Sequence, residues 1–233
     1  MGKRIISQAR GHGSLSYRVR KKAYQYKIKY PMSEGEAEIL NIIHSAAHSA
    51  PLMKLKIGNE VFYDPAFNGA IVGDKIMIGQ NAEPRAGNIM MLKNVPVGTS
   101  IYNLENNPGD GGKMIRTAGN AGMVFKQHEH NKISVTMPNK KEIILSGDCR
   151  VTLGVIAGDG RKLKPFIKAG NMFYKMKARN KLWPRTSAVK MNAVDHPFGS
   201  GRGKRIKSKI AKRNAPPGAR VGHIRPRRTG REK

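Results

Sequence analysis

Apolar and polar residues alternate in short runs through the middle of the chain. Such alternation places successive side chains on opposite faces of an extended backbone, so each run predicts a half-buried β-strand. Turn-forming pairs such as Asn68-Gly69 and Pro138-Asn139 separate the runs. Short strands spaced roughly 8–12 residues apart favour small barrels or sandwiches over α/β units. The runs cover residues 52–57, 61–63, 75–78, 89–92, 100–104, 123–125, 132–137, 142–145 and 150–156.

Residues 34–44 do not follow this simple alternation. Their apolar side chains stand at Ile39, Leu40, Ile42 and Ile43. That spacing fits a helix as well as a strand, so the pattern alone leaves both alternatives open.

The remaining segments predict connections and one helix. Residues 81–87 contain Pro and Gly and are typical of a linker between two barrels. The strand pattern fades after residue 163, and a short basic helix is predicted over residues 175–181, bracketed by Gly170 and Pro184. Irregular backbone is expected beyond Pro197.

Charge is distributed very unevenly along the 233 residues, whose formal net charge is +29. Residues 1–30 hold nine basic residues and no acidic one, while residues 31–160 hold 12 basic and 13 acidic residues. Residues 161–233 hold 23 basic and two acidic residues. A nearly neutral body therefore lies between two cationic segments, and such a balance calls for a polyanionic partner.

The cationic segments suggest nucleic acid rather than a membrane or a solvated tail. No apolar run approaches the roughly 20 residues that span a bilayer, and residues 1–10 lack the apolar stretch of a signal peptide. A lone Cys149 fits a reducing compartment, so a cytoplasmic location is expected. Aromatic residues such as Trp183 lie among the charges, and aromatic rings stack on unpaired bases.

Two glycine-rich segments superficially resemble nucleotide-binding loops. Residues 109–114 end in Met114, where a P-loop needs Ser or Thr to hold magnesium. Residues 199–203 lack the strand and helix that flank a dinucleotide-binding loop. Close contact between backbone and RNA is the preferred interpretation of both.

Candidate metal and catalytic groups are sparse. His128-Glu129-His130 is interpreted as an exposed hairpin turn, because one Cys and scattered His residues do not supply a four-ligand zinc site. Asp195, His196 and Ser200 are the residue types of a hydrolase triad, but neighbours this close in sequence rarely converge on one centre. Cys149 lies in an apolar run, where a thiol is usually inert.

The order of several motifs resembles the large-subunit ribosomal protein two family in its archaeal form. Ser200 stands where members of that family commonly carry Gly. The motifs that carry the resemblance are Ser49-Ala50-Pro51-Leu52, Val72-Gly73-Asp74-Lys75-Ile76, Asn94-Val95-Pro96-Val97-Gly98-Thr99, Pro108-Gly109-Asp110-Gly111-Gly112, Arg116-Thr117-Ala118-Gly119, Cys149-Arg150-Val151-Thr152-Leu153-Gly154, Ala193-Val194-Asp195-His196-Pro197-Phe198-Gly199, Arg213-Asn214-Ala215-Pro216-Pro217-Gly218 and Arg228-Thr229-Gly230.

The resemblance implies a mainly β fold, in which an oligonucleotide-binding (OB) barrel precedes an SH3-like barrel. It makes residues 34–44 the opening strand of the first barrel. The expected domains are a basic N-terminal extension over residues 1–33, the OB-fold barrel over 34–84, the SH3-like barrel over 85–160 and a basic C-terminal extension over 161–233.

The resemblance also implies a structural, non-enzymatic role in translation. The expected partners are large-subunit rRNA, neighbouring ribosomal proteins, small-subunit rRNA at an intersubunit bridge and, indirectly, tRNA, with no membrane partner. It implies support of the peptidyl transferase region by the loop around Asp195-His196-Pro197. No cofactor is expected, apart from magnesium or potassium ions at rRNA contacts. Chromatin packaging and RNA processing are the alternative functions that the charge alone allows.

The predicted rRNA-binding residues combine the resemblance with the cationic segments. They are Arg10, Arg18, Arg20, Lys21, Lys22, Arg116, Lys177, Arg179, Lys181, Trp183, Arg185, Asn192, Asp195, His196, Pro197, Arg202, Lys204, Arg205, Arg213, Arg220, Arg227 and Arg228.

Overall fold

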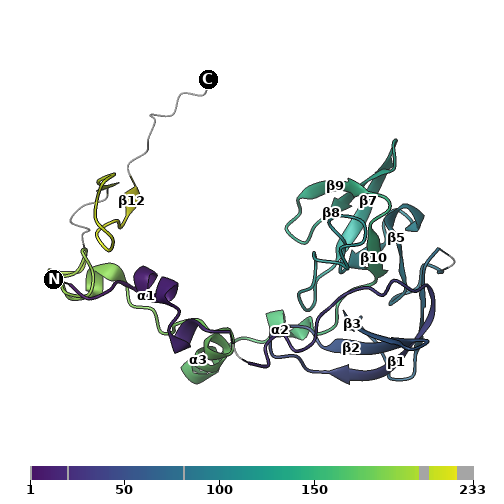
Figure 1. Ribbon diagram of the computed structural model, residues 1–233, viewed down its shortest axis with the longest axis horizontal. Helices are drawn as coiled ribbons and strands as arrows, with labels where there is room; N and C mark the ends of the chain where they lie inside the picture. The colour runs from purple at the N-terminus through teal and green to yellow at the C-terminus, as the bar shows by residue number, and fades with distance from the viewer. Residues whose placement is uncertain (1, 20, 81, 205–209, 225–233) are drawn as a thin grey trace. The chain divides into compact units, whose positions relative to one another are not determined.

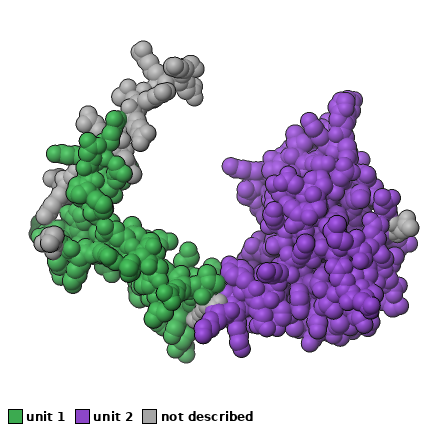
Figure 2. Space-filling model, in the orientation of Figure 1, with its two compact units in different colours: residues 1–20, 167–233 green, residues 21–166 purple. Residues whose placement is uncertain are grey.

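The structure of the chain, a computed structural model, describes residues 2–19, 21–80, 82–204 and 210–224. The chain divides into two compact units, which Figure 2 colours separately. Unit 2 comprises Lys21–Phe166, and unit 1 comprises Met1–Arg20 together with Ile167–Lys233. The predicted domain boundaries stay predictions, and the units divide the chain after residue 20 rather than after residue 33.

Unit 2 is built on a β-sheet whose described strands follow the order β3-β2-β1-β4-β5-β10-β6-β7-β8-β9 (Figure 1). Its neighbouring strands are antiparallel except for β4 and β5, which share a single parallel pair, Ile78 with Ile89. The strands are β1 (Gly35–Ile43), β2 (Leu52–Ile57), β3 (Glu60–Pro65), β4 (Lys75–Ile78), β5 (Ile89–Met91), β6 (Ser100–Tyr102), β7 (Gly122–His128), β8 (Lys132–Thr136), β9 (Glu142–Ser146) and β10 (Arg150–Leu153).

Two separate hydrophobic cores correspond to the two halves of this sheet. One core gathers inward side chains of β1 to β4, such as Ile39 and Leu55, and the other gathers those of β5 to β10, such as Val135 and Val151. The mainly β architecture confirms the predicted fold class and is consistent with an OB-fold followed by an SH3-like barrel. Short helical turns η2 (Leu92–Asn94) and α2 (Gly160–Leu163) complete unit 2.

The structure confirms a strand at residues 34–44 and explains why its pattern was ambiguous. Ile39 pairs with Leu55 and Asn41 pairs with Lys54, so Leu40 is the extra residue of a β-bulge. A bulge shifts the phase of inward and outward positions by one residue. The apolar side chains therefore fall on a spacing that imitates a helix.

A buried polar cluster joins the segment before β1 to both halves of unit 2. Tyr30 Oη lies 2.7 Å from Asn103 O and 2.8 Å from Thr152 Oγ1, and Thr152 Oγ1 lies 2.9 Å from Asp64 Oδ2. The side-chain amide of Asn103 donates to Asp64 Oδ1. All four residues are buried. Residues 28–31 thus belong to the folded body and not to a free extension.

The number of protons available for hydrogen bonds in this cluster depends on whether the carboxyl group of Asp64 is protonated. The hydroxyls of Tyr30 and Thr152 bring two protons, whereas three contacts run in a row from Asn103 O to Asp64. Thr152 Oγ1 donates to Asp64 Oδ2 when the carboxyl group is ionised, and a proton on Asp64 would free the Thr152 proton for Tyr30 Oη. Burial, the largest cause, raises the pKa of Asp64 from its ordinary 3.8 to about 7. The carboxyl group of Asp64 therefore holds its proton well above the usual pH range.

Glu105 is the second fully buried carboxyl group and is charge-paired. It lies 3.1 Å from Arg150 Nη2 and accepts the backbone N–H of Arg150 at 2.8 Å. Arg150 also donates to Pro31 O at 2.6 Å, and its guanidinium lies 5.3 Å from the centroid of the Tyr30 ring. Because a buried charge requires a partner, this pair fixes residues 30–31 against the second half of unit 2.

Unit 1 combines short helices with irregular backbone. The predicted basic helix is confirmed as α3, but both of its predicted ends were wrong. It begins at Ala169, so Gly170 lies in its first turn and not at a boundary. It ends before Asn180, which has φ 51°, while the N–H of Lys181 bonds Met176 O at 3.0 Å in a Schellman motif. The elements are α1 (Ile6–His12), η1 (Leu15–Tyr17), α3 (Ala169–Ala178), η3 (Ala188–Lys190), β11 (Ile210–Ala211) and β12 (His223–Ile224).

Within the described residues, no helix combines the length and apolar character needed to cross a membrane.

Asp64→Asn is expected to remove a pH dependence of stability. The folded-state pKa of about 7 exceeds the unfolded value of 3.8, so the native state holds this proton more tightly. The stabilisation that this proton gives to the native state is therefore complete below about pH 4 and is lost as the pH rises through about 7. The free energy of unfolding falls by about 4 kcal/mol over this range. Urea unfolding followed by circular dichroism at several pH values measures it. Parallel stability curves for wild type and variant would contradict the assignment.

Candidate nucleic-acid interface

The cations of unit 1 have almost no carboxylates to neutralise them. Its described residues contain one acidic residue, Asp195, which pairs with Lys3 at 3.5 Å. The other described ion pairs, such as Lys93 with Asp148 at 3.1 Å, all lie in unit 2. Most side chains on α3 and in the loops after it are exposed to solvent. The exposed residues predicted to bind rRNA include Arg10, Arg18, Lys177, Arg179, Lys181, Arg185, Asn192, Pro197, Arg202, Lys204, Arg213 and Arg220.

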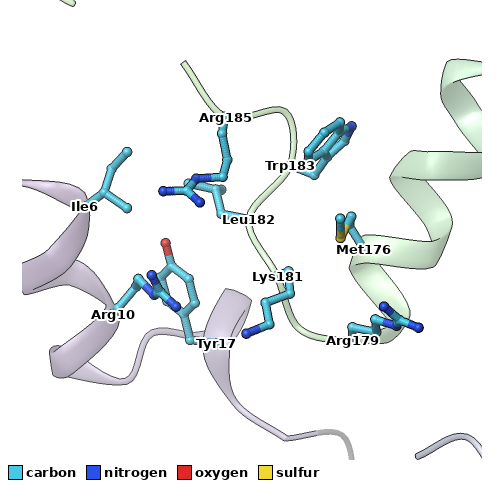
Figure 3. A pocket seen from close by; sticks show the side chains of 9 residues that line it. All are labelled: Ile6, Arg10, Tyr17, Met176, Arg179, Lys181, Leu182, Trp183 and Arg185. Atoms are coloured by element: carbon cyan, nitrogen blue, oxygen red, sulfur yellow. The ribbon is translucent and has the colours of Figure 1, made fainter. Parts of the chain in front are cut away.

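A hollow of about 350 Å³ lies between α1, η1, the end of α3 and the loop that follows it. In Figure 3, Lys181 and Arg185 extend from that loop toward Tyr17 and α1, and Trp183 lies on the side of α3. Both aromatic rings are half-buried. The lining residues are Ile6, Arg10, Tyr17, Met176, Arg179, Lys181, Leu182, Trp183 and Arg185.

A second hollow, of about 480 Å³, adjoins the first. The two hollows share Ile6, Arg10 and Arg185, so both arginine side chains line both hollows. The second hollow has a more polar lining, which includes hydroxyl groups and an imidazole. Its further lining residues are Ile5, Ser7, Thr186, Ser187, Ala188, Met191 and His196.

The loop that contains Asp195, His196 and Pro197 is closed by its own backbone. The N–H groups of Asp195 and His196 donate to Asn192 O at 3.0 and 3.2 Å, and the N–H of Ser200 donates to Met191 O at 3.0 Å. These bonds fix the backbone without any contact to a ligand.

Two positions of this loop place special demands on the backbone. A Cβ atom added at Gly199 would lie 2.2 Å from Asn192 O, so only glycine allows the close approach. Ser200 has φ 73°, a left-handed conformation that favours Gly.

His196 is oriented as a hydrogen-bond donor rather than as a catalytic base. Its Nδ1 accepts the N–H of Phe198 at 3.0 Å, so the neutral ring carries its proton on Nε2. Asp195 is paired with Lys3, and no bond joins Asp195, His196 and Ser200 in a row. The structure therefore agrees with the interpretation that these residues do not form a triad.

Arg116, predicted to bind rRNA, has its described bonds inside unit 2. Its Nε donates to Asn103 Oδ1 at 2.7 Å, and its Nη2 donates to the carbonyl groups of Gly112 and Ile28. These bonds give it a structural role beside the Asp64 cluster, and they lend no support to the predicted rRNA contact. Lys21 and Lys22, by contrast, are exposed.

The glycine-rich segment at residues 109–112 narrows one expectation. The N–H groups of Gly109 and Gly111 donate to the Glu105 carboxylate at 3.1 and 2.9 Å, and that of Gly112 donates to Asp110 Oδ1 at 3.1 Å. Amides that are already bonded to carboxylates are not available for phosphate. The predicted contact between this backbone and RNA stays a prediction, and it would have to use atoms other than these three N–H groups.

The other candidate metal-binding and catalytic side chains, His128 and Cys149, have their contacts within the folded body. His128 ends β7 and lies 2.7 Å from Ser134 Oγ, and residues 129–131 form the predicted hairpin turn. The part of the chain that the structure describes holds no cluster of three metal-ligating side chains. Burial, with nearby Glu105, raises the pKa of the Cys149 thiol to about 11, which keeps it protonated and inert.

Four predicted rRNA-binding residues lie outside the part of the chain that the structure describes, and one aromatic residue that lines a hollow was not predicted. Arg20, Arg205, Arg227 and Arg228 lie outside the described residues. Tyr17 lines the first hollow but was not predicted, because its neighbours there are distant in sequence. The signal that could have found it is an aromatic residue within a basic segment.

A cationic unit poor in carboxylates, attached to a β-barrel body, is typical of nucleic-acid-binding proteins. A family model described as "Ribosomal Proteins L2, C-terminal domain" matches residues 85–218. The protein "Large ribosomal subunit protein uL2" of Archaeoglobus fulgidus is 46% identical over 236 residues, covering 99% of both chains. Those of Sulfurisphaera tokodaii and Methanococcus maripaludis are 41% and 42% identical over at least 99% of each chain.

The chain is therefore a ribosomal protein by descent. It belongs to the ribosomal protein L2 (uL2) family, in its archaeal form, as its motifs indicated.

Gly199→Ala is expected to open the loop around residues 192–200, because the added methyl group collides with the carbonyl group of Asn192. Hydrogen–deuterium exchange of a peptide spanning the loop should become faster. Gly170→Ala is the matched control, since a Cβ atom there meets nothing within 4 Å. Unchanged exchange in Gly199→Ala would show that the loop tolerates the side chain.

Proposed function

We propose that this chain is a structural constituent of the large ribosomal subunit in the cytoplasm, and that unit 1 holds folded rRNA. The observation that carries the proposal is the separation of charge. The carboxylates of the protein lie almost entirely in unit 2, where several are paired internally, whereas the exposed cations of unit 1 have one described carboxylate among them. The names of the relatives support the assignment to this subunit.

The mechanism of binding is the release of counterions together with local recognition of shape. Lys and Arg side chains displace ions condensed on the RNA, so that affinity falls steeply with salt. Arg side chains such as Arg179 and Arg202 can donate two parallel hydrogen bonds to one phosphate, whereas Lys acts as a point charge. Magnesium or potassium ions at the rRNA contacts would complement these cations without being resident cofactors.

The finer role is the support of the RNA machinery rather than catalysis. The rigid loop at Asn192, Asp195 and His196 presents an imidazole donor and a fixed backbone turn, and we assign it to the peptidyl transferase region. Subunit association through small-subunit rRNA, contacts with neighbouring ribosomal proteins and an indirect effect on tRNA binding belong to the same proposal. No general acid or base accompanies His196 among its described contacts, so the chemistry is left to the RNA.

Removal of four exposed cations from unit 1 should weaken binding to large-subunit rRNA and reduce its salt dependence. Each lost phosphate contact makes the slope of log K against log salt less negative by roughly 0.7–0.9, so the four together change it by about 3. Filter binding or fluorescence anisotropy over a salt series measures the slope. The substitutions, to Gln, are at Lys177, Lys190, Arg202 and Lys204, which line neither hollow.

The control removes the same charge from the exposed surface of unit 2 and should change the slope far less. Equal effects of the two sets would contradict the assignment of rRNA binding to unit 1. Competition with duplex DNA in the same assay separates this function from chromatin packaging. The control substitutions, also to Gln, are at Lys56, Lys126, Lys132 and Lys141.

A further inference from the structure

We propose that the two adjoining hollows of unit 1 bind two successive unpaired nucleotides of RNA, with the linking phosphate held by Arg10 and Arg185. This inference rests on the proposed function and names a ligand for one part of the surface. It assigns the first hollow to a stacked base and the second hollow to a nucleotide recognised through hydrogen bonds.

The first hollow has the size and lining that a base requires. Its volume of about 350 Å³ lies at the lower end of the range of roughly 300–1,000 Å³ that small-ligand sites occupy. Tyr17 and Trp183 are half-buried, so each ring is held in place while part of it remains open to the hollow. Base stacking on such rings contributes about 1–3 kcal/mol per base.

The junction of the hollows has the charge that a phosphate requires. Arg10 comes from α1 and Arg185 from the loop after α3, and both line both hollows. Neither guanidinium has an ion-pair partner among the described residues, and no acidic residue lines either hollow. A phosphodiester at this point places one nucleoside in each hollow.

The second hollow offers hydrogen-bonding groups in place of aromatic rings. Ser7, Thr186 and Ser187 carry hydroxyl groups, and His196 has its Nε2 proton available because Nδ1 is bonded to Phe198. Such groups suit a base edge or a 2′-hydroxyl, which distinguishes RNA from a plain polyanion. An acidic peptide would satisfy the arginines but has no flat ring for Tyr17 and Trp183.

The single Trp of the sequence provides a direct reporter. The full chain is titrated with a short oligoadenylate, a blunt RNA duplex, inorganic polyphosphate and polyglutamate, and the emission of Trp183 is recorded. Anisotropy measurements establish that each probe binds. Oligoadenylate should quench Trp183 saturably, whereas the other three probes should bind without this quenching. Equal quenching by polyphosphate or polyglutamate would overturn the proposal, as would bound oligoadenylate that leaves the emission unchanged.

Substitutions at Tyr17 and Arg185 test the two parts of the site separately. Tyr17→Ala should weaken oligoadenylate binding about tenfold, and Tyr17→Phe should retain it, because stacking needs the ring and not the hydroxyl. Arg185→Lys keeps the charge but loses the planar guanidinium group that donates two parallel hydrogen bonds. It should therefore weaken oligoadenylate binding more than polyphosphate binding. The control Tyr174→Ala removes an exposed ring that lines neither hollow and should have no effect.

The outcome distinguishes this inference from the proposed function. Salt-dependent binding of large-subunit rRNA that is unaffected by Tyr17→Ala, with Trp183 emission unchanged, would overturn the dinucleotide site and leave the proposed function intact. A full chain that binds large-subunit rRNA no better than polyglutamate would overturn both.

Discussion

Two buried carboxyl groups, Asp64 and Glu105, hold the body of this protein together. Asp64 ends a chain of hydrogen bonds that begins at Tyr30, and burial raises the pKa of its carboxyl group to about 7. Glu105 forms an ion pair with Arg150 and accepts hydrogen bonds from the backbone amides of a glycine-rich turn. Burial of Asp64 raises its pKa, whereas the burial of Glu105 is offset by an ion pair and hydrogen bonds. Together they fix the segment before β1 against both halves of the sheet.

Because acidic groups are used inside unit 2, most of the uncompensated positive charge of the chain lies in unit 1. Unit 2 holds 19 basic and 13 acidic residues and pairs several of its carboxylates internally, so its excess of positive charge is small. Unit 1 has the opposite balance, with many exposed cations and one described acidic residue that is already paired with Lys3. A protein so divided can fold its body in isolation and still require RNA to neutralise the remainder. Membership of the uL2 family agrees with a folded body in unit 2 and an excess of exposed cations in unit 1.

The sequence predicted the strands well because their signal is local. Alternation and turn residues are sufficient to place β2 or β4, whereas the bulge at Leu40 left the pattern of β1 open between helix and strand until the family resemblance decided it. Helix α1 was missed because seven residues carry too little periodicity to recognise. The ends of α3 were misplaced because Gly170 was taken as a boundary, whereas the actual stop is the left-handed Asn180.

The candidate site was predictable only in part, for a different physical reason. Charge is visible in the sequence, so Arg179, Lys181 and Arg185 could be assigned to RNA. The direction of a side chain is not visible in the sequence. Arg116 donates its described hydrogen bonds inside unit 2. The hollows were hidden because they join residues 5–17 to residues 176–196, which only the folded chain brings together.

The most direct test of the central claim is crosslinking of the chain to rRNA within intact large subunits. Ultraviolet crosslinking followed by mass spectrometry identifies the residues that touch RNA. The account predicts that the crosslinked peptides concentrate in unit 1, above all between residues 177 and 204. Crosslinks confined to the strands and turns of unit 2, with unit 1 free of RNA, would contradict it.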